Sequence, residues 1–283
     1  MAELKPPPQD LIEADVQRAL AEDFGPGDVT ADLIDADARA SARIVCREQA
    51  VIAGIPWAQA CFLALDPDVA IDWSCKDGGR VPADAMLCRI EGAARALVGA
   101  ERCALNFLQT LSATATATRG YVDAVAGTHA TILDTRKTLP GLRIAQKYAV
   151  RCGGGANHRI GLFDAILIKE NHVAAAGGIG PAVAAARTRH PDLLLEVEVE
   201  SLDELAEALR SGADRVLLDD FTLPMLHEAV ALAAGSVPLE VSGSVDLARV
   251  RGIAECGVDY ISIGALTKHV RAIDMSMRFE TSY

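Results

Sequence analysis

A dense run of basic side chains between residues 131 and 172 is the part of this sequence best suited to chemistry. It holds seven lysines or arginines against three acids, although the 283-residue chain carries a formal net charge of −12. The basic residues are Arg136, Lys137, Arg143, Lys147, Arg151, Arg159 and Lys169. Such runs also occur on solvated helix faces, but several of these cations lie beside apolar strand ends and a glycine triplet. A cationic pocket in an acidic protein suits a small polyanion bearing phosphate or carboxylate groups. Nucleic acid would require a broad basic face and a basic domain, so it is not expected.

Acids at the ends of predicted strands form a second candidate group. Glutamates alternate with apolar residues over Leu194–Glu200, and a strand period of two directs Glu196, Glu198 and Glu200 to one side. On an edge strand they would form a solvated face, whereas in a buried strand they need a cation or hydroxyl partner. Asp219 ends the next predicted strand. Glu198 and Asp219 could together hold sugar hydroxyls or a hydrated Mg²⁺, which binds few protein ligands.

Two short turns after the last predicted strands are candidate phosphate sites. They are Val241–Ser244, which reads Val-Ser-Gly-Ser, and Ile263–Thr267, which reads Ile-Gly-Ala-Leu-Thr. In α/β barrels the loops after the late strands commonly bind phosphate through backbone N–H groups. The triplet Gly153–Gly155 lacks the G-x-x-x-x-G-K-[ST] pattern of a nucleotide P-loop. Asp219–Asp220 is not followed by a Gly/Thr-rich loop, which argues against the common phosphoribosyltransferase fold.

The composition is that of a cytoplasmic α/β enzyme. The hydrophobic fraction is 51%, and the longest weakly polar stretch, Val51–Leu65, is interrupted by Gly54 and Pro56, so no membrane span is expected. Met1–Asp10 carries three consecutive prolines rather than an apolar signal region, so export is not expected. The seven cysteines show no C-x-x-C spacing, which favours buried reduced thiols.

The first of two regions that must position these groups has mixed secondary structure. Up to about residue 100, a helix over 11–22 is followed by strand-like runs at 42–46, 69–73 and 85–90. A long helix-compatible stretch then covers 101–126. Its small-residue segment 112–118 either permits close packing or forms a low-complexity linker.

The second region alternates short apolar runs with helix-length segments, which predicts parallel βαβ units. The apolar runs begin near Thr131, Ala165, Leu194, Arg215, Pro238 and Tyr260. Six strands are fewer than the eight of a closed barrel. The expected fold class is therefore α/β, an incomplete α/β barrel with an N-terminal α+β sandwich domain. The sandwich is expected over 1–112 and the barrel over 113–267, with a C-terminal helix over about 268–283 packing on the sandwich. Ligands should bind at the carboxyl ends of the strands.

Together these segments resemble the quinolinate phosphoribosyltransferase family over nearly the whole chain. The longest motif is Asp134–Arg143, which reads Asp-Thr-Arg-Lys-Thr-Leu-Pro-Gly-Leu-Arg. The other matching segments are Gly27–Thr30, Glu101–Arg102, Gln146–Val150, Gly153–Gly155, Asn157–Arg159, Lys169–His172, Glu196–Val199, Leu217–Asp219, Glu240–Gly243 and Ile263–Thr267. Many motifs in one order make the resemblance specific.

The resemblance implies transfer of a phosphoribosyl group from 5-phosphoribosyl pyrophosphate to quinolinate with decarboxylation. The products would be nicotinate mononucleotide, CO₂ and pyrophosphate, as in NAD biosynthesis, and the implied cofactor is Mg²⁺. A homodimer, or a higher oligomer built on dimers, is implied, with Arg102 reaching the partner's site. Catalytic roles fall on Lys137, Lys169, Glu198 and Asp219, and the two acids would hold Mg²⁺ directly or through water. The implied substrate-binding residues are Arg102, Thr135, Arg136, Lys137, His158, Arg159, Lys169, Glu198, Asp219, Ser242, Gly243, Ser244, Ile263, Gly264 and Ala265.

Two positions depart from the family pattern, and other functions stay open. Glu170 stands where the family usually has aspartate, and Ser244 stands where a second glycine is common, which adds strain if that position has a positive φ. A related phosphoribosyltransferase acting on another ring acid, as in homologues encoded with molybdate transport, would look similar. A barrel aldolase with a Schiff base on Lys137 or Lys169, or a non-catalytic anion-binding protein, is a further alternative.

Overall fold

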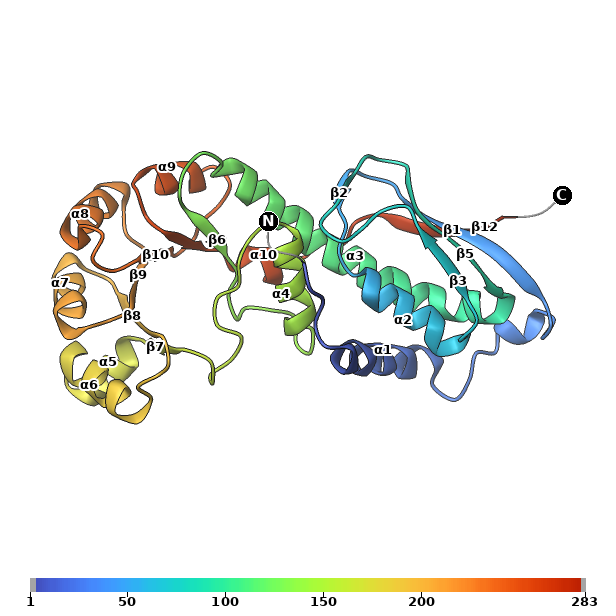
Figure 1. The fold of residues 1–283 in the computed structure, drawn as a ribbon, viewed down its shortest axis with the longest axis horizontal. Helices are drawn as coiled ribbons and strands as arrows, with labels where there is room; N and C mark the ends of the chain where they lie inside the picture. The colour runs from blue at the N-terminus through green and yellow to red at the C-terminus, as the bar shows by residue number, and fades with distance from the viewer. Residues whose placement is uncertain (1–3, 281–283) are drawn as a thin grey trace. The chain divides into compact units, whose positions relative to one another are not determined.

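The N-terminal part of the chain builds an antiparallel sheet covered by helices. The computed structural model describes residues 4–280, and within them four strands pair in the order β12-β1-β5-β3. Their bounds are Arg39–Cys46 (β1), Ala70–Trp73 (β3), Ala85–Ala93 (β5) and Met275–Glu280 (β12). A small ladder joins β2 (Ala50–Val51) to β4 (Arg80–Val81). Figure 1 shows the first three α-helices gathered beside this sheet.

The predicted C-terminal helix is wrong. The short helix α10 (Ala265–Lys268) ends where that helix was expected to begin, and Met275–Glu280 is a strand paired antiparallel with β1. The reason is a period of two: Met275 and Met277 are buried, whereas Ser276 is half-buried and Arg278 is exposed. Residues 281–283 of the predicted helix lie outside the described residues.

The helices beside this sheet follow from regularly spaced apolar residues. On the first helix Ile12, Val16 and Leu20 recur every four residues and are buried in the core. The small-residue segment over 112–118 is helix rather than linker, and Ser112 Oγ accepts a hydrogen bond from the backbone N–H of Ala53 at 3.1 Å. The bounds are Gln9–Phe24 (α1), Ala31–Leu33 (η1, a 3₁₀ turn), Ile55–Leu65 (α2), Ala94–Ala124 (α3) and Arg143–Cys152 (α4).

The chain forms two compact units that do not follow a single boundary. The N-terminal unit contains residues up to Arg119, Thr138–Gly154 and the residues from Leu266 onward; the barrel unit contains Gly120–Lys137 and Gly155–Ala265. These limits differ from the boundaries expected at residues 112 and 267. Helix α4 belongs to the N-terminal unit because Ala145, Tyr148, Ala149 and Cys152 are buried in the same apolar core as α1 and α2.

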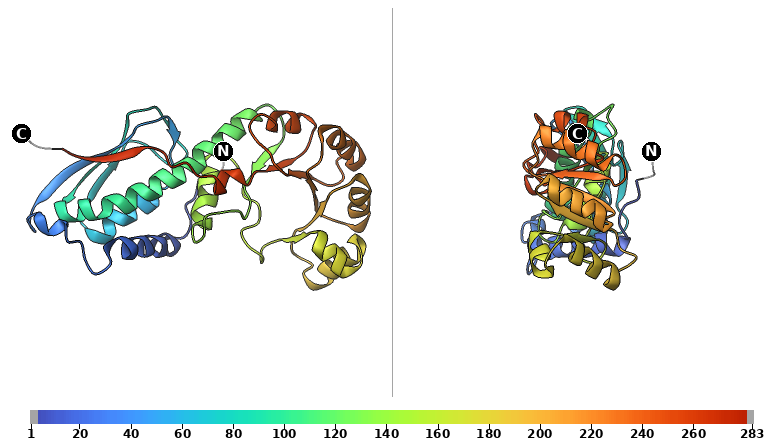
Figure 2. Two further views of the ribbon diagram at one scale, coloured as in Figure 1. Left: turned by 180° about the vertical axis from the view of Figure 1, so that it is seen from behind. Right: turned by 90° about the vertical axis from the view of Figure 1, so that its left-hand side faces the viewer.

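The barrel unit is an open parallel sheet with helices on its outer face, which confirms the predicted incomplete barrel. Among the described residues six strands pair in the order β6-β11-β10-β9-β8-β7, so β6 and β7 are edge strands. Both Figure 1 and Figure 2 show the helices in an arc outside the curved sheet. The strands are Thr131–Leu133 (β6), Ile166–Ile168 (β7), Leu195–Val199 (β8), Arg215–Asp219 (β9), Leu239–Ser242 (β10) and Tyr260–Ser262 (β11). The helices are Glu170–Ala176 (α5), Ile179–Arg189 (α6), Leu202–Ser211 (α7), Leu223–Ala233 (α8) and Val250–Glu255 (α9).

Candidate functional site

A cavity of about 430 Å³ lies at the carboxyl ends of these parallel strands, within the barrel unit. It gathers eight of the predicted site residues: Thr135, Arg136, Lys137, His158, Arg159, Lys169, Glu198 and Ser242. The sequence prediction did not name six other lining residues as site residues: His172, Glu240, Ser262 and three leucines. Its walls therefore carry four Lys or Arg side chains and two glutamates. The four cations are the hydrogen-bond donors that an anion needs.

The loop after β6 contributes the first two cations. Thr135 Oγ1 accepts a hydrogen bond from the backbone N–H of Lys137 at 3.0 Å, which shapes the turn that carries Arg136 and Lys137 into the cavity wall. Gly264, in the turn after β11, packs against this lysine, because a Cβ there would lie 3.1 Å from Lys137 Cδ. A larger residue at 264 would displace the lysine side chain.

A buried aspartate fixes the loop that carries Arg159. Asp134 is fully buried, and its two carboxylate oxygens accept from Asn157 Nδ2 at 2.6 Å and from the backbone N–H of His158 at 2.9 Å. Partial burial, and next the charge of Arg136, lower the pKa of Arg159. Two guanidinium groups that repel each other in a partly desolvated wall are stabilised when an anion binds between them.

An ion pair joins two of the predicted catalytic residues. Lys169 follows β7 and caps α5, and its Nζ lies 2.5 Å from Glu198 Oε2 on β8. Asp219 ends the adjacent strand β9, although it is not among the residues lining the cavity. Of the three alternating glutamates, Glu196 is buried, Glu198 half-buried and Glu200 exposed just beyond the strand. A charged lysine therefore compensates Glu198, as a buried carboxylate requires.

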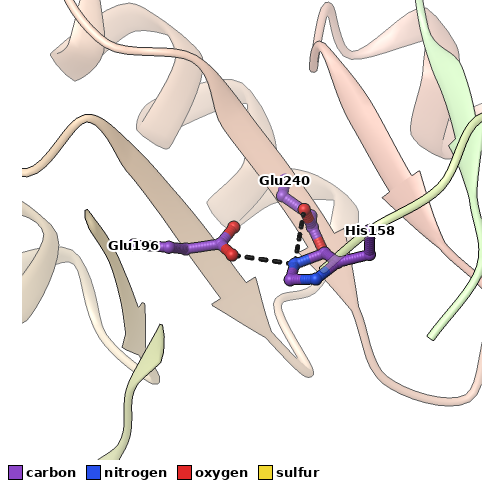
Figure 3. A group of neighbouring side chains, drawn as sticks. All are labelled: His158, Glu196 and Glu240. Carbon is purple, nitrogen blue, oxygen red and sulfur yellow. Dashed lines mark hydrogen bonds and ion pairs between the residues drawn. The ribbon is translucent and has the colours of Figure 1, made fainter. Parts of the chain in front are cut away.

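Two buried glutamates converge on one imidazole at the wall of the cavity (Figure 3). His158 Nε2 lies 2.8 Å from Glu196 Oε2 and 3.4 Å from Glu240 Oε2. Arg215 Nη1 is 3.2 Å from the same oxygen of Glu240, and the Ser262 hydroxyl donates to the other. Burial raises the pKa of both glutamates, and burial together with the charge of Glu196 brings that of Glu240 to about 7. Sequence reasoning noted Glu240 only within a motif, and no spacing signal links positions 158, 196 and 240.

Comparison with known proteins decides the family. The quinolinate phosphoribosyl transferase N-terminal domain family matches residues 28–112, and the C-terminal domain family matches residues 114–278. The chain belongs to the quinolinate phosphoribosyltransferase family. It is 39% identical to quinolinate phosphoribosyltransferase [decarboxylating] 1b of Nicotiana tabacum, over 98% of this chain and 85% of that protein. The solved structure of the nicotinate-nucleotide pyrophosphorylase from Francisella tularensis is 45% identical and superposes with a TM-score of 0.95, over 99% of this chain and 100% of that one. A probable nicotinate-nucleotide pyrophosphorylase [carboxylating] of Synechocystis is 40% identical over 96% of this chain and 94% of that protein.

The turns that the family resemblance assigns to phosphate lie at the same ends of the strands. Gly243 has φ 101°, and a Cβ there would lie 2.1 Å from Asp220 Oδ1 and 2.9 Å from the backbone nitrogen of Asp220, so only glycine fits. Ser244 has φ 42°, which meets the condition under which serine adds strain. The predicted residues Gly243, Ser244, Ile263, Gly264 and Ala265 are not among those lining the cavity; they extend the site prediction beyond it.

Arg102 belongs to the N-terminal unit, whereas the residues that line this cavity belong to the barrel unit. It is exposed on α3 in the N-terminal unit and lines a cavity of about 380 Å³ there with Arg18, Asp23 and Phe107. Its predicted reach into a partner's site stays a prediction. None of the helices within residues 4–280 has the length and apolar character needed to cross a membrane.

Proposed function

We propose that this family member transfers the phosphoribosyl group of 5-phosphoribosyl pyrophosphate to quinolinate, giving nicotinate mononucleotide, CO₂ and pyrophosphate. The observation that carries the proposal is the convergence of Arg136, Lys137, Arg159 and Lys169 on one cavity in a chain of net charge −12. Quinolinate bears two adjacent carboxylates and its co-substrate bears more negative charge, so both need a wall of fixed cations. The names of the relatives agree with this reaction, and they do not favour another ring acid as the substrate.

The reaction needs positioning and charge more than proton transfer. The pyridine nitrogen attacks the anomeric carbon as the bond to the pyrophosphate oxygen breaks, and positive charge develops on the ribose. The carboxylates of Glu198 and Asp219 are suited to stabilise that charge, while lysine ammonium groups neutralise the leaving pyrophosphate. The ring nitrogen is then cationic, so the carbon–carbon bond to the adjacent carboxylate can break. Its electron pair stays on the ring as an ylide, which takes a proton from water.

Mg²⁺ is the proposed cofactor, and the acids present fit it. Glu198 and Asp219 end neighbouring strands, and carboxylate oxygens are the ligands that Mg²⁺ prefers. Because Glu198 already pairs with Lys169 at 2.5 Å, we infer that a hydrated ion is held through water. The ion would supply charge neutralisation for pyrophosphate. Turnover should therefore stop in excess chelator and return with added Mg²⁺.

We further propose a homodimer, or an oligomer built on dimers, in which Arg102 of one copy completes the cavity of the other. Its guanidinium is exposed on α3 and has no ion-pair partner among residues 4–280, which suits a contact supplied by a second copy. Arg102→Ala and Lys137→Ala proteins should each be nearly inactive, whereas mixing them should restore up to one working site per hybrid dimer. Failure to complement after verified subunit exchange would contradict a shared site.

We propose a cytoplasmic location, supported by cysteine chemistry. All seven cysteines lie within the described residues and are free, and burial raises the pKa of the Cys61 and Cys152 thiols. Unpaired, protonated thiols are usual where the medium is reducing. Some plant relatives are named as mitochondrial or chloroplastic, so fractionation of the native host should decide the compartment.

One assay tests the activity. Purified enzyme with quinolinate, 5-phosphoribosyl pyrophosphate and Mg²⁺ should form nicotinate mononucleotide and release one CO₂ per turnover. Nicotinate, which lacks the second carboxylate, is the control and should not be used, because its binding would leave partly buried cations unpaired. Comparable turnover of nicotinate would overturn the substrate assignment.

A further inference from the structure

Both ring nitrogens of His158 are used by groups of this chain. Nε2 points at the two buried glutamates (Figure 3), and Nδ1 accepts a hydrogen bond from the backbone N–H of Arg159 at 2.8 Å. A ring nitrogen can accept only when it carries no proton. The geometry therefore assigns His158 to the neutral tautomer with its proton on Nε2, directed at Glu196 and Glu240. In this state the imidazole adds no positive charge to the cavity.

The same geometry argues against a metal ion at this cluster. The ligand atoms of His158, Glu196 and Glu240 lie within 4.8 Å of one another, a spacing at which a cation could bind. A metal on Nε2 would have to replace the ring proton while the N–H of Arg159 still occupies Nδ1. The ring would then be an imidazolate, which is much less stable than a neutral imidazole near pH 7. Arg215 at 3.2 Å already supplies Glu240 with a positive charge.

The two carboxylates that hold the ring are buried, and further donors hold Glu240 in place. Glu196 and Glu240 are 1% and 0% exposed. Glu240 accepts from Arg215 and from the Ser262 hydroxyl, and the Arg215 guanidinium stacks 4.1 Å from the centre of the Tyr260 ring. Donors from the two adjacent strands, β9 and β11, thus hold Glu240, whereas Oε1 of Glu196 has no hydrogen-bond partner among the described residues. A buried carboxylate that accepts from two such donors has one favoured geometry.

This network reaches Arg159 through one backbone group. The glutamates hold the imidazole ring of His158, and its backbone N–H donates to Asp134 at 2.9 Å. The ring nitrogen Nδ1 in turn accepts from the backbone N–H of Arg159. The next residues turn away, with the N–H groups of Ile160 and Gly161 capped by Asp164. The backbone position of Arg159 therefore depends on the imidazole, while its guanidinium Nη1 donates to the Ala165 carbonyl at 3.4 Å.

We propose that Glu196 and Glu240 are positioning residues that act through neutral His158 to place Arg159 for the dicarboxylate substrate. The proposal deepens the proposed function and rests on it for its kinetic arm only. It separates two kinds of group at the cavity: cations that contact the substrate, and a buried acid pair whose role is exerted through His158. Loss of the pair should weaken quinolinate binding while the phosphoribosyl pyrophosphate site keeps its own contacts.

The ring state can be measured without turnover. The chain contains six histidines, so ¹⁵N-histidine labelling gives six imidazoles, and the His158 signals are those that vanish in His158→Asn. At pH 7.5 one protonated and one unprotonated nitrogen are expected, unchanged when phthalate, an inert dicarboxylate mimic, is saturating. Two protonated nitrogens, with or without phthalate, would make His158 a cationic substrate ligand and overturn the proposal. Displacement of both signals by one equivalent of Zn²⁺ would assign the cluster to a metal and also overturn it.

Kinetics of Glu240→Gln test the positioning role. The change keeps the side-chain size but removes the charge opposite Arg215 and the ring, so the KM for quinolinate should rise about tenfold. The KM for phosphoribosyl pyrophosphate and kcat should each change less than about threefold. Glu48→Gln is the matched control: it also removes a glutamate that accepts from an arginine, Arg271, but in the N-terminal unit.

The outcomes separate this proposal from the proposed function. If wild-type enzyme does not turn over quinolinate, the function fails, and the NMR result alone decides the tautomer. If wild-type enzyme is active and Glu240→Gln raises both KM values alike, or changes neither, the positioning role is wrong. If Glu240→Gln does not fold, calorimetric binding of phthalate to His158→Asn replaces it, with a tenfold loss expected and unchanged affinity contradicting the proposal.

Discussion

Enclosed acids in the two compact units have different kinds of partner. In the N-terminal unit Asp77 accepts from the Tyr148 hydroxyl at 2.7 Å and from the backbone N–H of Ile55 at 3.2 Å, both of them neutral donors. In the barrel unit Glu240 accepts from the Arg215 guanidinium and faces an imidazole and a second carboxylate. Burial raises the pKa of Asp77 and of Glu240 alike.

The difference shows that charged partners surround the buried acid beside the cavity, whereas neutral donors surround the buried acid of the N-terminal unit. Neutral donors around Asp77 join α2, α4 and a loop within a packed core. Around Glu240 the partners include the Arg215 guanidinium and the Glu196 carboxylate, and Glu240 itself lines the cavity, so a bound anion and these charged groups share one electrostatic field. Substitutions in the first unit should therefore change stability, and those in the second should change ligand binding.

The largest effect is expected from Arg159→Ala. A bidentate guanidinium–carboxylate contact has no nearby substitute, so kcat/KM for quinolinate should fall by about a thousandfold or more. The free energy of unfolding should change little, because repulsion from Arg136 is relieved. Calorimetric titration should show phthalate binding lost and phosphoribosyl pyrophosphate binding kept. Equal loss of both ligands would mean that the cavity does not separate the two substrates.

Asp77→Asn should show the opposite pattern. The amide cannot accept as strongly from Tyr148 and the Ile55 N–H, so the free energy of unfolding should fall by about 2 kcal/mol. Kinetic constants measured well below the unfolding temperature should stay within twofold of wild type. Urea denaturation and steady-state kinetics on the same preparation measure both quantities. A large kinetic effect without lost stability would remove the contrast between the units.

The sequence predicted the barrel well because its signals are local. Each of the six apolar runs became a parallel strand within one residue of its expected start, since βαβ units alternate strongly in hydropathy. The motif residues after those strands converge because carboxyl ends of parallel strands share one edge. Eight predicted residues from five segments consequently line one cavity.

What the sequence could not predict depends on contacts between distant residues. In the sequence, helix α4 lies between segments of the barrel unit, yet the ring of Tyr148 packs in the N-terminal core with its centroid 5.7 Å from that of Trp57. The periodicity of the sequence does not predict this contact. The C-terminal strand was missed because a short run with two methionines one residue apart is compatible with either a strand or a helix. The two glutamate partners of His158 Nε2 lie 38 and 82 positions further along the chain, so no local sequence pattern indicates that this nitrogen is occupied.

The pH dependence of stability should sharpen the comparison. The pKa of Glu240 is raised from an ordinary 4.5 to about 7, so its protonated form favours the folded state. The associated stability is fully present below pH 4.5 and is lost as the pH rises through 7. The difference in unfolding free energy between wild type and Glu240→Gln, measured by urea denaturation, should therefore decrease as the pH rises from about 5 to about 8. The Arg271 side chain lowers the pKa of Glu48, so Glu48→Gln should differ from wild type only through changes below about pH 4.5, in the opposite direction. Parallel curves for both variants would contradict the assignment.

The smallest effect concerns strained backbone, which occurs in both units. Ser244 in the barrel unit has φ 42° and Asp84 in the N-terminal unit has φ 62°. A positive φ costs serine about 1 kcal/mol, whereas aspartate tolerates it better. Ser244→Gly should therefore raise the free energy of unfolding by somewhat less than about 1 kcal/mol, and Asp84→Gly should raise it by still less. Only Ser244→Gly should also change the KM for phosphoribosyl pyrophosphate, because only it alters a proposed phosphate turn. Urea denaturation and kinetics of both variants measure this. If Ser244→Gly is destabilised, or if Asp84→Gly alters that KM, then strain and substrate binding are not divided between the units as proposed.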